Sequence, residues 1–220
     1  MKILRIPERL SAIIFDIDST LYTNDEYAHE QVDAQIRHFA RLRGMTDDEA
    51  RRQVGAWREE YAKAHGRKVS LGNALVHFGV PIAESIRWRE ELLEPARFLS
   101  RDDRLREALE ALKARYALVA VTNNPVLPAG KTLDALGVRD LFLSLIGLDT
   151  TGVSKPHEKP FLAARAAAGC PAAECLSVGD RYDIDIALPL ELGMGGILVD
   201  GVADVYALPE LLARSRESNA

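Results

Sequence analysis

The sequence predicts an α/β fold, a doubly wound and mostly parallel sheet with an inserted α-helical domain. From residue 104 onward, apolar runs of strand length alternate with amphipathic stretches of helix length, which is the pattern of a parallel sheet with crossover helices. Between about residues 25 and 93 the periodicity is helical only. We therefore expect an α/β core of residues 1–22 and 97–220 and a helical domain of residues 23–96.

The composition is that of an ordinary globular protein. A chain of 220 residues with 47% hydrophobic residues can bury a substantial core. The net charge of -5, with scattered lysines and arginines, argues against a nucleic-acid polymer as partner. Because no segment approaches the roughly 18 consecutive apolar residues of a membrane span, we expect a cytoplasmic protein without membrane contact. We also expect a monomer or homodimer.

The first expected strand covers residues 12–15 and ends directly before two acids. The run is short, apolar and rich in isoleucine, as in a buried strand. Asp16 and Asp18 follow it, with Thr20 close behind. The loops beyond the carboxyl ends of parallel strands form the ligand crevice, so these acids are directed at a site. Aspartate and threonine also cap helices, and this cluster alone leaves that role open.

The inserted segment is expected to hold about four helices. One apolar stripe ends at Gly44, and a second follows residues 46–49, where Thr46 and Glu49 have the spacing of a capping box. Shorter helical stretches follow at about residues 71–78 and 83–93. We interpret the aromatic side chains of these stripes as core packing.

The rest of the core is expected to alternate helices with four further strands. Ser100 and Asp103 have the spacing to cap the first of these helices. The expected strands cover residues 116–121, 142–146, 175–178 and 196–199. The later helices are expected at residues 129–136, from Pro160 to near Gly169, and ending at Gly193.

Two polar clusters after these strands fit a phosphate. Thr122 and Asn123 follow the strand of residues 116–121 and offer a hydroxyl, an amide and backbone N–H groups. Lys155 stands in a later loop, where a solvated lysine is the alternative interpretation. Lys159 is its rival but lies further into the expected helix.

A third cluster follows the expected strand of residues 175–178. The spacing of Asp180 and Asp185 can direct Asp180 toward a metal ion while Asp185 lies on the following helix turn, and a plain helix cap is the alternative interpretation. If both converged with Asp16 and Asp18 in one crevice, the four carboxylates would repel one another strongly without a cation. We therefore predict bound Mg²⁺.

Together these clusters resemble the haloacid dehalogenase (HAD) superfamily of aspartyl phosphatases, which implies a Rossmann-like core. The resemblance covers nearly the whole chain, and the place of the helical insert is similar to the C1 cap of that superfamily. The run FDIDSTLY, which ends at Tyr22, resembles the subgroup containing pyrimidine 5′-nucleotidases. The four motifs occur in order as Asp16, Asp18 and Thr20; Thr122; Lys155; and Gly179, Asp180 and Asp185.

The resemblance implies Mg²⁺-dependent hydrolysis of a small phosphate monoester through an aspartyl phosphate, with a nucleoside monophosphate as one candidate substrate. Asp16 would be the nucleophile and Asp18 the acid and base. The residues implied to bind the phosphoryl group are Thr122, Asn123 and Lys155. The implied metal ligands are Asp16, the backbone carbonyl of Asp18, and Asp180, with Thr20 and Asp185 in support.

Three alternatives stay open. A haloacid dehalogenase would use an aspartate nucleophile without a second acid or metal, so Asp18 argues against it. A phosphomutase retains all the acids, and only a test for isomerisation of a sugar phosphate separates it. A non-catalytic phosphate-binding module is disfavoured because the acids are intact at all four positions.

Overall fold

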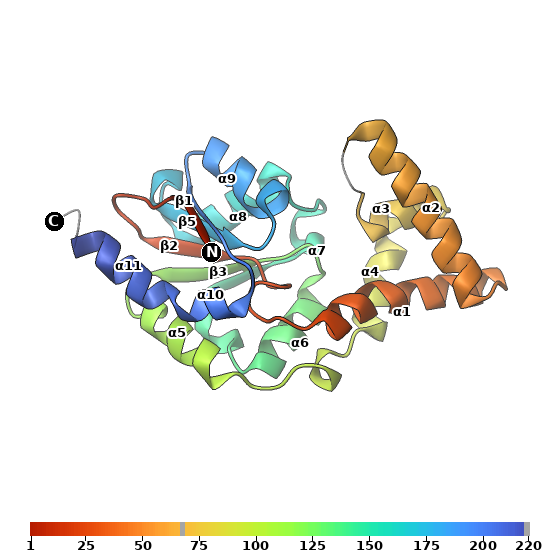
Figure 1. Cartoon of the computed structure of the whole chain (residues 1–220), viewed down its shortest axis with the longest axis horizontal. Helices are drawn as coiled ribbons and strands as arrows, with labels where there is room; N and C mark the ends of the chain where they lie inside the picture. The colour runs from red at the N-terminus through yellow and green to blue at the C-terminus, as the bar shows by residue number, and fades with distance from the viewer. Residues whose placement is uncertain (67–68, 218–220) are drawn as a thin grey trace. The chain divides into compact units, whose positions relative to one another are not determined.

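The computed structural model describes residues 1–66 and 69–217, and the chain divides into two compact units. One unit comprises Met1–Asn24 with Pro95–Ala220, and the other comprises Asp25–Glu94. The predicted α/β class is confirmed, because the described part of the first unit contains a six-stranded sheet with helices on both faces (Figure 1). That the second unit serves as a cap stays a prediction.

The sheet has the strand order β1-β6-β5-β2-β3-β4, and only the β1–β6 pair among the described strands is antiparallel. The strands are β1 (Lys2–Arg5), β2 (Ala12–Phe15), β3 (Ala117–Val121), β4 (Ser144–Ile146), β5 (Cys175–Gly179) and β6 (Gly195–Leu198). The central strand β2 is buried throughout, and Phe15 at its end lies level with Ala120 and Val178. The segments that follow β2, β3 and β5 therefore begin side by side.

The edge strand β1 is not predicted from the sequence. It is only four residues long and mostly exposed, so it carries no apolar pattern of a buried strand. Its pairing with β6, which sets Ile3 opposite Ile197, forms it instead. The guanidinium of Arg5 reinforces this edge, since Nε donates a hydrogen bond to the carbonyl of Met194 at 2.9 Å.

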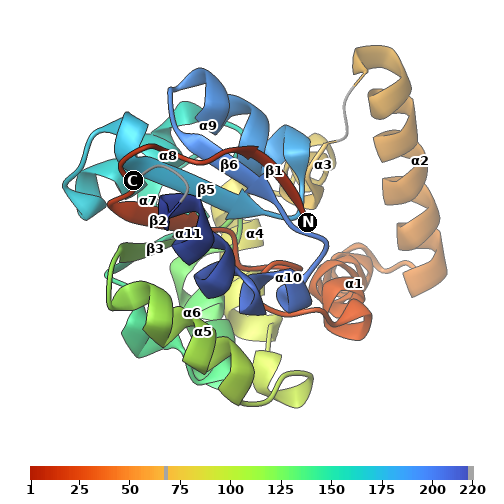
Figure 2. The same ribbon diagram turned by 60° about the vertical axis from the view of Figure 1, so that its left-hand side comes forward.

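Helices cover both faces of the sheet. Figure 2 shows α8 and α9 on one face and α5, α6, α10 and α11 on the other. The helices of this unit are α5 (Asp103–Lys113), α6 (Val126–Leu136), α7 (Leu148–Thr151), α8 (Glu158–Ala168), α9 (Ala187–Glu191), α10 (Val202–Tyr206) and α11 (Leu208–Glu217), with the 3-10 turns η1 (Pro95–Arg97), η2 (Arg139–Leu141) and η3 (Ala172–Glu174) and the π-helical turn η4 (Tyr182–Ile186). Among the described residues, no helix is both long and apolar enough to cross a membrane.

Three helix starts differ from their predicted positions. The cap of α5 is neither Ser100 nor Asp103 but Asp102, whose carboxylate accepts a hydrogen bond from the backbone N–H of Leu105 at 3.0 Å. Helix α8 begins two residues before Pro160, and α6 begins three residues before position 129. Proline is tolerated anywhere in the first turn, where its missing N–H has no helical partner, so it does not fix the first residue of a helix.

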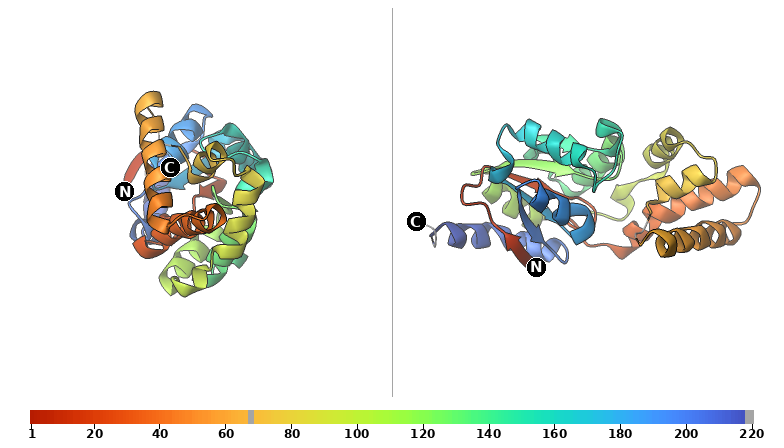
Figure 3. Two further views of the ribbon diagram at one scale, coloured as in Figure 1. Left: turned by 90° about the vertical axis from the view of Figure 1, so that its right-hand side faces the viewer. Right: turned by 90° about the horizontal axis from the view of Figure 1, so that it is seen from above.

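The second unit is helical, as predicted. Its described residues form α1 (Asp25–Arg43), α2 (Asp47–His65), α3 (Leu71–His77) and α4 (Ile82–Leu92). Helix α1 packs against α2 and α4, and α3 packs against α2 and α4 (Figure 3). The predicted capping box is confirmed, since Thr46 and Glu49 each bond the backbone N–H of the other. The aromatic side chains of Phe39 and Trp88 lie in the core of this unit.

A buried acid ties α1 to α2. The side chain of Asp33 is only 7% exposed, and its two oxygens accept hydrogen bonds from Arg51 of α2 at 2.7 and 3.1 Å. Arg37, one turn further along α1, bonds the same carboxylate. The hydrogen bonds from Arg51 hold the pKa of Asp33 below its ordinary value. This carboxylate therefore stabilises the unit in its ionised form.

We expect Asp33→Asn to lower the free energy of unfolding of this unit by about 1–2 kcal/mol, because it removes a charged hydrogen-bond acceptor between two helices. Both tryptophans of the chain, Trp57 and Trp88, lie in this unit, so urea unfolding followed by tryptophan fluorescence measures it selectively. The matched control is Asp48→Asn. Asp48 bonds the same Arg51 but is 76% exposed, and its loss should change stability by less than about 0.5 kcal/mol. An equal loss of unfolding free energy in the two variants would contradict the conclusion that the Asp33 carboxylate stabilises this unit.

The bond between Asp33 and Arg51 also predicts a pH dependence of stability. Because the pKa of Asp33 is lowered in the folded state, its contribution is fully present above the unfolded-state value and is lost as the pH falls through the folded-state value. The unfolded-state value is about 3.9. Below about pH 4, the fluorescence-monitored stability of the unmodified protein should therefore fall more steeply than that of Asp33→Asn. Parallel curves for the two proteins would count against this linkage.

Candidate active site

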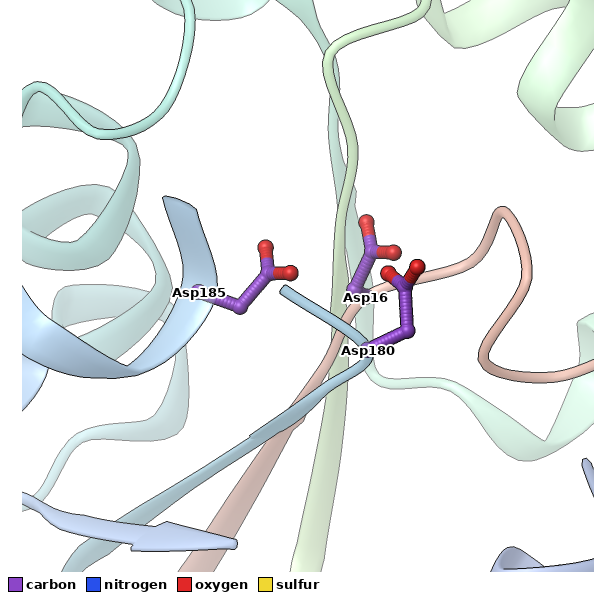
Figure 4. Close-up of side chains that lie close together, drawn as sticks. All are labelled: Asp16, Asp180 and Asp185. Carbon is purple, nitrogen blue, oxygen red and sulfur yellow. The ribbon is translucent and has the colours of Figure 1, made fainter. Parts of the chain in front are cut away.

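The acids and the lysine singled out in the sequence converge at the carboxyl ends of the strands. Asp16 follows β2, Thr122 follows β3 and Asp180 follows β5. Lys155 lies between α7 and α8, and Asp185 lies in η4. Carboxylate oxygens of Asp16, Asp180 and Asp185 lie within 4.8 Å of one another, and Figure 4 shows the Asp185 carboxylate directed toward the other two.

The ammonium group of Lys155 joins this cluster. Its Nζ lies 2.6 Å from Oδ1 of Asp16 and 2.6 Å from Oδ1 of Asp185, and it donates a third hydrogen bond to the carbonyl of Val121 at 2.9 Å. All three N–H donors of the ammonium are therefore used. Lys155 is 4% exposed, so it is not a solvated loop lysine, whereas its rival Lys159 is exposed. A charge this deeply buried is tolerated only when it is paired.

The cluster has an excess of negative charge. Burial raises the pKa of Asp16 well above its ordinary value, with Lys155 opposing and Asp185 adding to the shift. Burial disfavours the charged form of Lys155, but the two carboxylates outweigh it and raise its pKa. Burial, and next Asp185, raises the pKa of Asp180 to about 6. Ionised together, the three carboxylates exceed the one ammonium by two negative charges, which a divalent cation would neutralise.

Asp185 is held from three sides. Lys155 bonds its Oδ1, the backbone N–H of Arg181 donates to its Oδ2 at 3.2 Å, and the hydroxyl of Ser177 donates to its backbone carbonyl at 2.7 Å. A Cβ at Gly179 would lie 2.4 Å from the Cβ of Asp185, so only glycine fits at the end of β5. These contacts fit the predicted supporting role of Asp185 through Lys155.

The side-chain amide of Asn123 fixes the backbone that carries Lys155. Its Nδ2 donates to the carbonyl of Lys155 at 3.1 Å, and its Oδ1 accepts from the N–H of Lys155 at 2.7 Å. The sequence assigns Asn123 to the phosphate instead. That role stays a prediction.

Asp18 has a different environment from Asp16. The hydroxyl of Tyr22 donates to its Oδ1 at 2.6 Å, while the hydroxyl of Thr122 and the amide of Asn124 donate to its Oδ2 at 3.1 and 3.0 Å. The sequence assigned neither Tyr22 nor Asn124 to Asp18. The spacing of four residues between Asp18 and Tyr22 is the one local pattern that could have indicated their contact. Thr20, also predicted in support, donates to Oδ2 of Asp16 at 3.3 Å.

The donor set fits a hard divalent cation. It consists of carboxylate oxygens only, which are the ligands that Mg²⁺ prefers. Both oxygens of Asp185 already accept hydrogen bonds from Lys155 and Arg181. The two oxygens of Asp16 likewise accept hydrogen bonds, from Lys155 and Thr20. That Asp16 and Asp180 are the side chains that bind the ion stays a prediction.

The chain belongs to the haloacid dehalogenase-like hydrolase family, whose family model matches residues 10–192. It is 27% identical over 192 residues to the glyceraldehyde 3-phosphate phosphatase of Methanopyrus kandleri, a match covering 84% of this chain and 82% of that protein. It is 26% identical over 207 residues to the 5-amino-6-(5-phospho-D-ribitylamino)uracil phosphatase YigB of Escherichia coli, covering 88% of this chain and 85% of that protein. The crystal structure of a HAD phosphatase from Thermococcus onnurineus is similar in fold, with a TM-score of 0.63 at 21% identity over 92% of this chain and 98% of that one. The pyrimidine 5′-nucleotidase-like subgroup stays a prediction.

We expect Lys155→Met to destabilise the core unit by about 3–5 kcal/mol in EDTA, because it leaves two buried carboxylates without their countercharge. Native-state hydrogen exchange of the β2 and β3 amides measures this unit separately from the helical one. Lys159→Met is the matched control, since Lys159 is exposed and should change protection by less than about 0.5 kcal/mol. Unchanged protection in Lys155→Met would mean that the ion pairs do not stabilise the core.

Proposed function

We propose that this protein is a Mg²⁺-dependent phosphatase that hydrolyses small phosphorylated metabolites through an aspartyl phosphate on Asp16. The buried Asp16–Lys155–Asp185 group beside Asp180 carries the proposal. It combines a carboxylate nucleophile, a fixed cation and an oxygen site for a divalent ion in the crevice of the sheet. The two relatives named above are phosphatases of small metabolites, which supports the same reaction class.

The size of the barrier explains why several groups act together. Enzymes accelerate phosphate-monoester hydrolysis by up to about 10²¹-fold, roughly 28 kcal/mol. One general acid or base supplies only about 10²- to 10⁴-fold. A covalent step, proton transfer and charge neutralisation must therefore be combined at one site.

In the first step, a carboxylate oxygen of Asp16 attacks phosphorus as the bond to the leaving oxygen breaks. Asp18 gives its proton to that oxygen. In the second step, a water molecule loses a proton to Asp18 and attacks phosphorus, which releases inorganic phosphate and the carboxylate of Asp16. Lys155 lies against Asp16 in both steps and balances its charge, while the backbone near Asn123 binds the phosphoryl oxygens. Thr122, predicted for the same task, gives its hydroxyl proton to Oδ2 of Asp18 and holds that acid.

Asp16 and Asp180, with the backbone carbonyl of Asp18, would hold Mg²⁺. When bound, the ion neutralises charge on the phosphoryl oxygens. The second acid favours phosphate-ester chemistry over dehalogenation, which needs no such group, and Asp18 is held in place by three donors. A cytoplasmic location and a monomeric or dimeric state are part of the proposal.

The proposed activity predicts metal-dependent release of inorganic phosphate. A panel of p-nitrophenyl phosphate, UMP, CMP, phosphoglycolate, glyceraldehyde 3-phosphate and sugar phosphates should show turnover with Mg²⁺ and none in EDTA, and excess Mg²⁺ should restore it. The reason is that the carboxylate cluster needs a cation to accept an anionic substrate. Isomerisation of a sugar phosphate without net phosphate release would indicate a mutase instead. Full turnover by protein shown to be free of metal would overturn the metal requirement.

We expect Asp16→Asn to lower kcat by at least about 10³-fold, because an amide cannot form the acyl phosphate. Asp183→Asn is the matched control, since Asp183 lies between Asp180 and Asp185 in the sequence but is exposed and pairs with Arg181. It should retain near-normal kcat. Phosphate release from p-nitrophenyl phosphate with Mg²⁺ is the measurement. Near-normal rates in Asp16→Asn, free of contaminating unmodified enzyme, would remove Asp16 from the nucleophile role.

A further inference from the structure

We propose that Tyr22 is a positioning residue for Asp18, and that Oδ1 of Asp18, the oxygen bonded to Tyr22, is the one that carries the transferred proton. This inference rests on the proposed function, since it assigns a proton path within that reaction. The observation behind it is that the two oxygens of Asp18 face different kinds of partner.

The backbone after β2 brings Tyr22 to Asp18. The N–H of Leu21 donates to the carbonyl of Ile17 at 2.9 Å, which closes a five-residue turn. Ser19 within this turn adopts a left-handed φ of 59°. The side chains of Asp18 and Tyr22 meet at this turn, where the hydroxyl of Tyr22 reaches Oδ1 of Asp18 at 2.6 Å. Tyr22 is 3% exposed, so its ring is fixed by packing.

The opposite oxygen, Oδ2, faces groups that donate. The amide nitrogen of Asn124 can only donate, and it lies 3.0 Å from Oδ2. The hydroxyl of Thr122 accepts from the backbone N–H of Asn124 at 3.1 Å, which leaves its proton for Oδ2 at 3.1 Å. A proton on Oδ2 would point at the N–H of Asn124. The favourable position for the acidic proton is therefore Oδ1.

Tyr22 suits an oxygen that gains and loses a proton. A phenol hydroxyl donates to an ionised carboxylate and accepts from a protonated one, whereas an amide nitrogen can do only the first. When Asp18 protonates the leaving oxygen, the O–H bond at Oδ1 breaks as the leaving group gains its hydrogen. When water is deprotonated, that O–H bond forms again at Oδ1. In both steps Asn124 and Thr122 hold Oδ2 in place, and Tyr22 orients Oδ1 for the proton transfer.

We expect Tyr22→Phe to affect the steps in which Asp18 moves a proton. With an alkyl phosphate, whose leaving oxygen needs a proton, kcat/KM should fall by about 10- to 100-fold. With p-nitrophenyl phosphate, whose leaving group departs as the anion, kcat/KM should change by less than about threefold. Its kcat should still fall by about tenfold, because Asp18 must deprotonate water in the second step.

A double-mutant cycle shows whether Tyr22 acts through Asp18. In an Asp18→Asn background, Tyr22→Phe should change kcat for p-nitrophenyl phosphate by less than about twofold. The control is Tyr206→Phe, since Tyr206 donates to the carboxylate of Asp102 at 2.5 Å and offers the same kind of bond at the start of α5. It should leave both substrates unaffected. Asn124→Ala provides an independent variant. Its kcat/KM should also fall more on the alkyl phosphate than on p-nitrophenyl phosphate.

Two results would overturn the inference and leave Tyr22 a structural residue. One is an equal fall of kcat/KM on the two substrates, and the other is a fall of kcat in the Asp18→Asn background as large as in the unmodified protein. If Tyr22→Phe fails to fold by circular dichroism, the substrate selectivity of Asn124→Ala decides in its place. Failure of the proposed function looks different. In that case the unmodified protein itself turns over no phosphate ester with Mg²⁺. If the unmodified protein is active and Tyr22→Phe has the same kcat and kcat/KM on both substrates, only this inference is overturned.

Discussion

The constraint on which the site depends is a buried ammonium group between two carboxylates. Moving an ion into the protein interior costs several kcal/mol even after relaxation, and this cost is offset only when the geometry of its partners is good. Lys155 meets that condition with contacts from three separated segments, the end of β2, the end of β3 and the turn η4. Misplacing the end of β2 or the turn η4 would separate buried charges, and misplacing the end of β3 would leave an N–H of the ammonium without its acceptor. The fold and the site are therefore coupled through this one group.

A second layer of residues explains how the partners reach Lys155. Asn123 pairs with both backbone groups of Lys155, and Ser177 holds the carbonyl of Asp185. Gly179 removes the Cβ that would otherwise collide with Asp185. Each of these residues lies in β5 or within two residues of the end of β3, and these two strands flank β2. The parallel register of three strands thus determines where the charged groups meet.

The site was predictable from the sequence to the extent that its residues follow buried strands. Asp16, Thr122 and Asp180 stand directly after apolar runs, and parallel strands bring such positions together. The strand β1 and the cap at Asp102 were not predicted, because the first depends on pairing with β6 and the second on which of several polar residues reaches the helix N–H groups. The bond between Tyr22 and Asp18, which only their spacing of four residues could have indicated, and the use of Asn123 by Lys155 depend likewise on side-chain packing.

The two acids after β2 are only two residues apart, and their environments divide the proposed roles between them. Asp16 is buried against a cation, which favours its ionised form, although burial and the neighbouring carboxylates act against that form. A nucleophile must be ionised, so a second cation beside Lys155 is what the chemistry of Asp16 requires. The hydrogen-bond donors that hold Asp18 include two hydroxyls and an amide, which are neutral. Neutral partners allow a carboxyl group to alternate between its charged and protonated forms, as an acid that later becomes a base must do. The same short turn can therefore supply both functions, because the surroundings of each acid, and not its residue type, select its task.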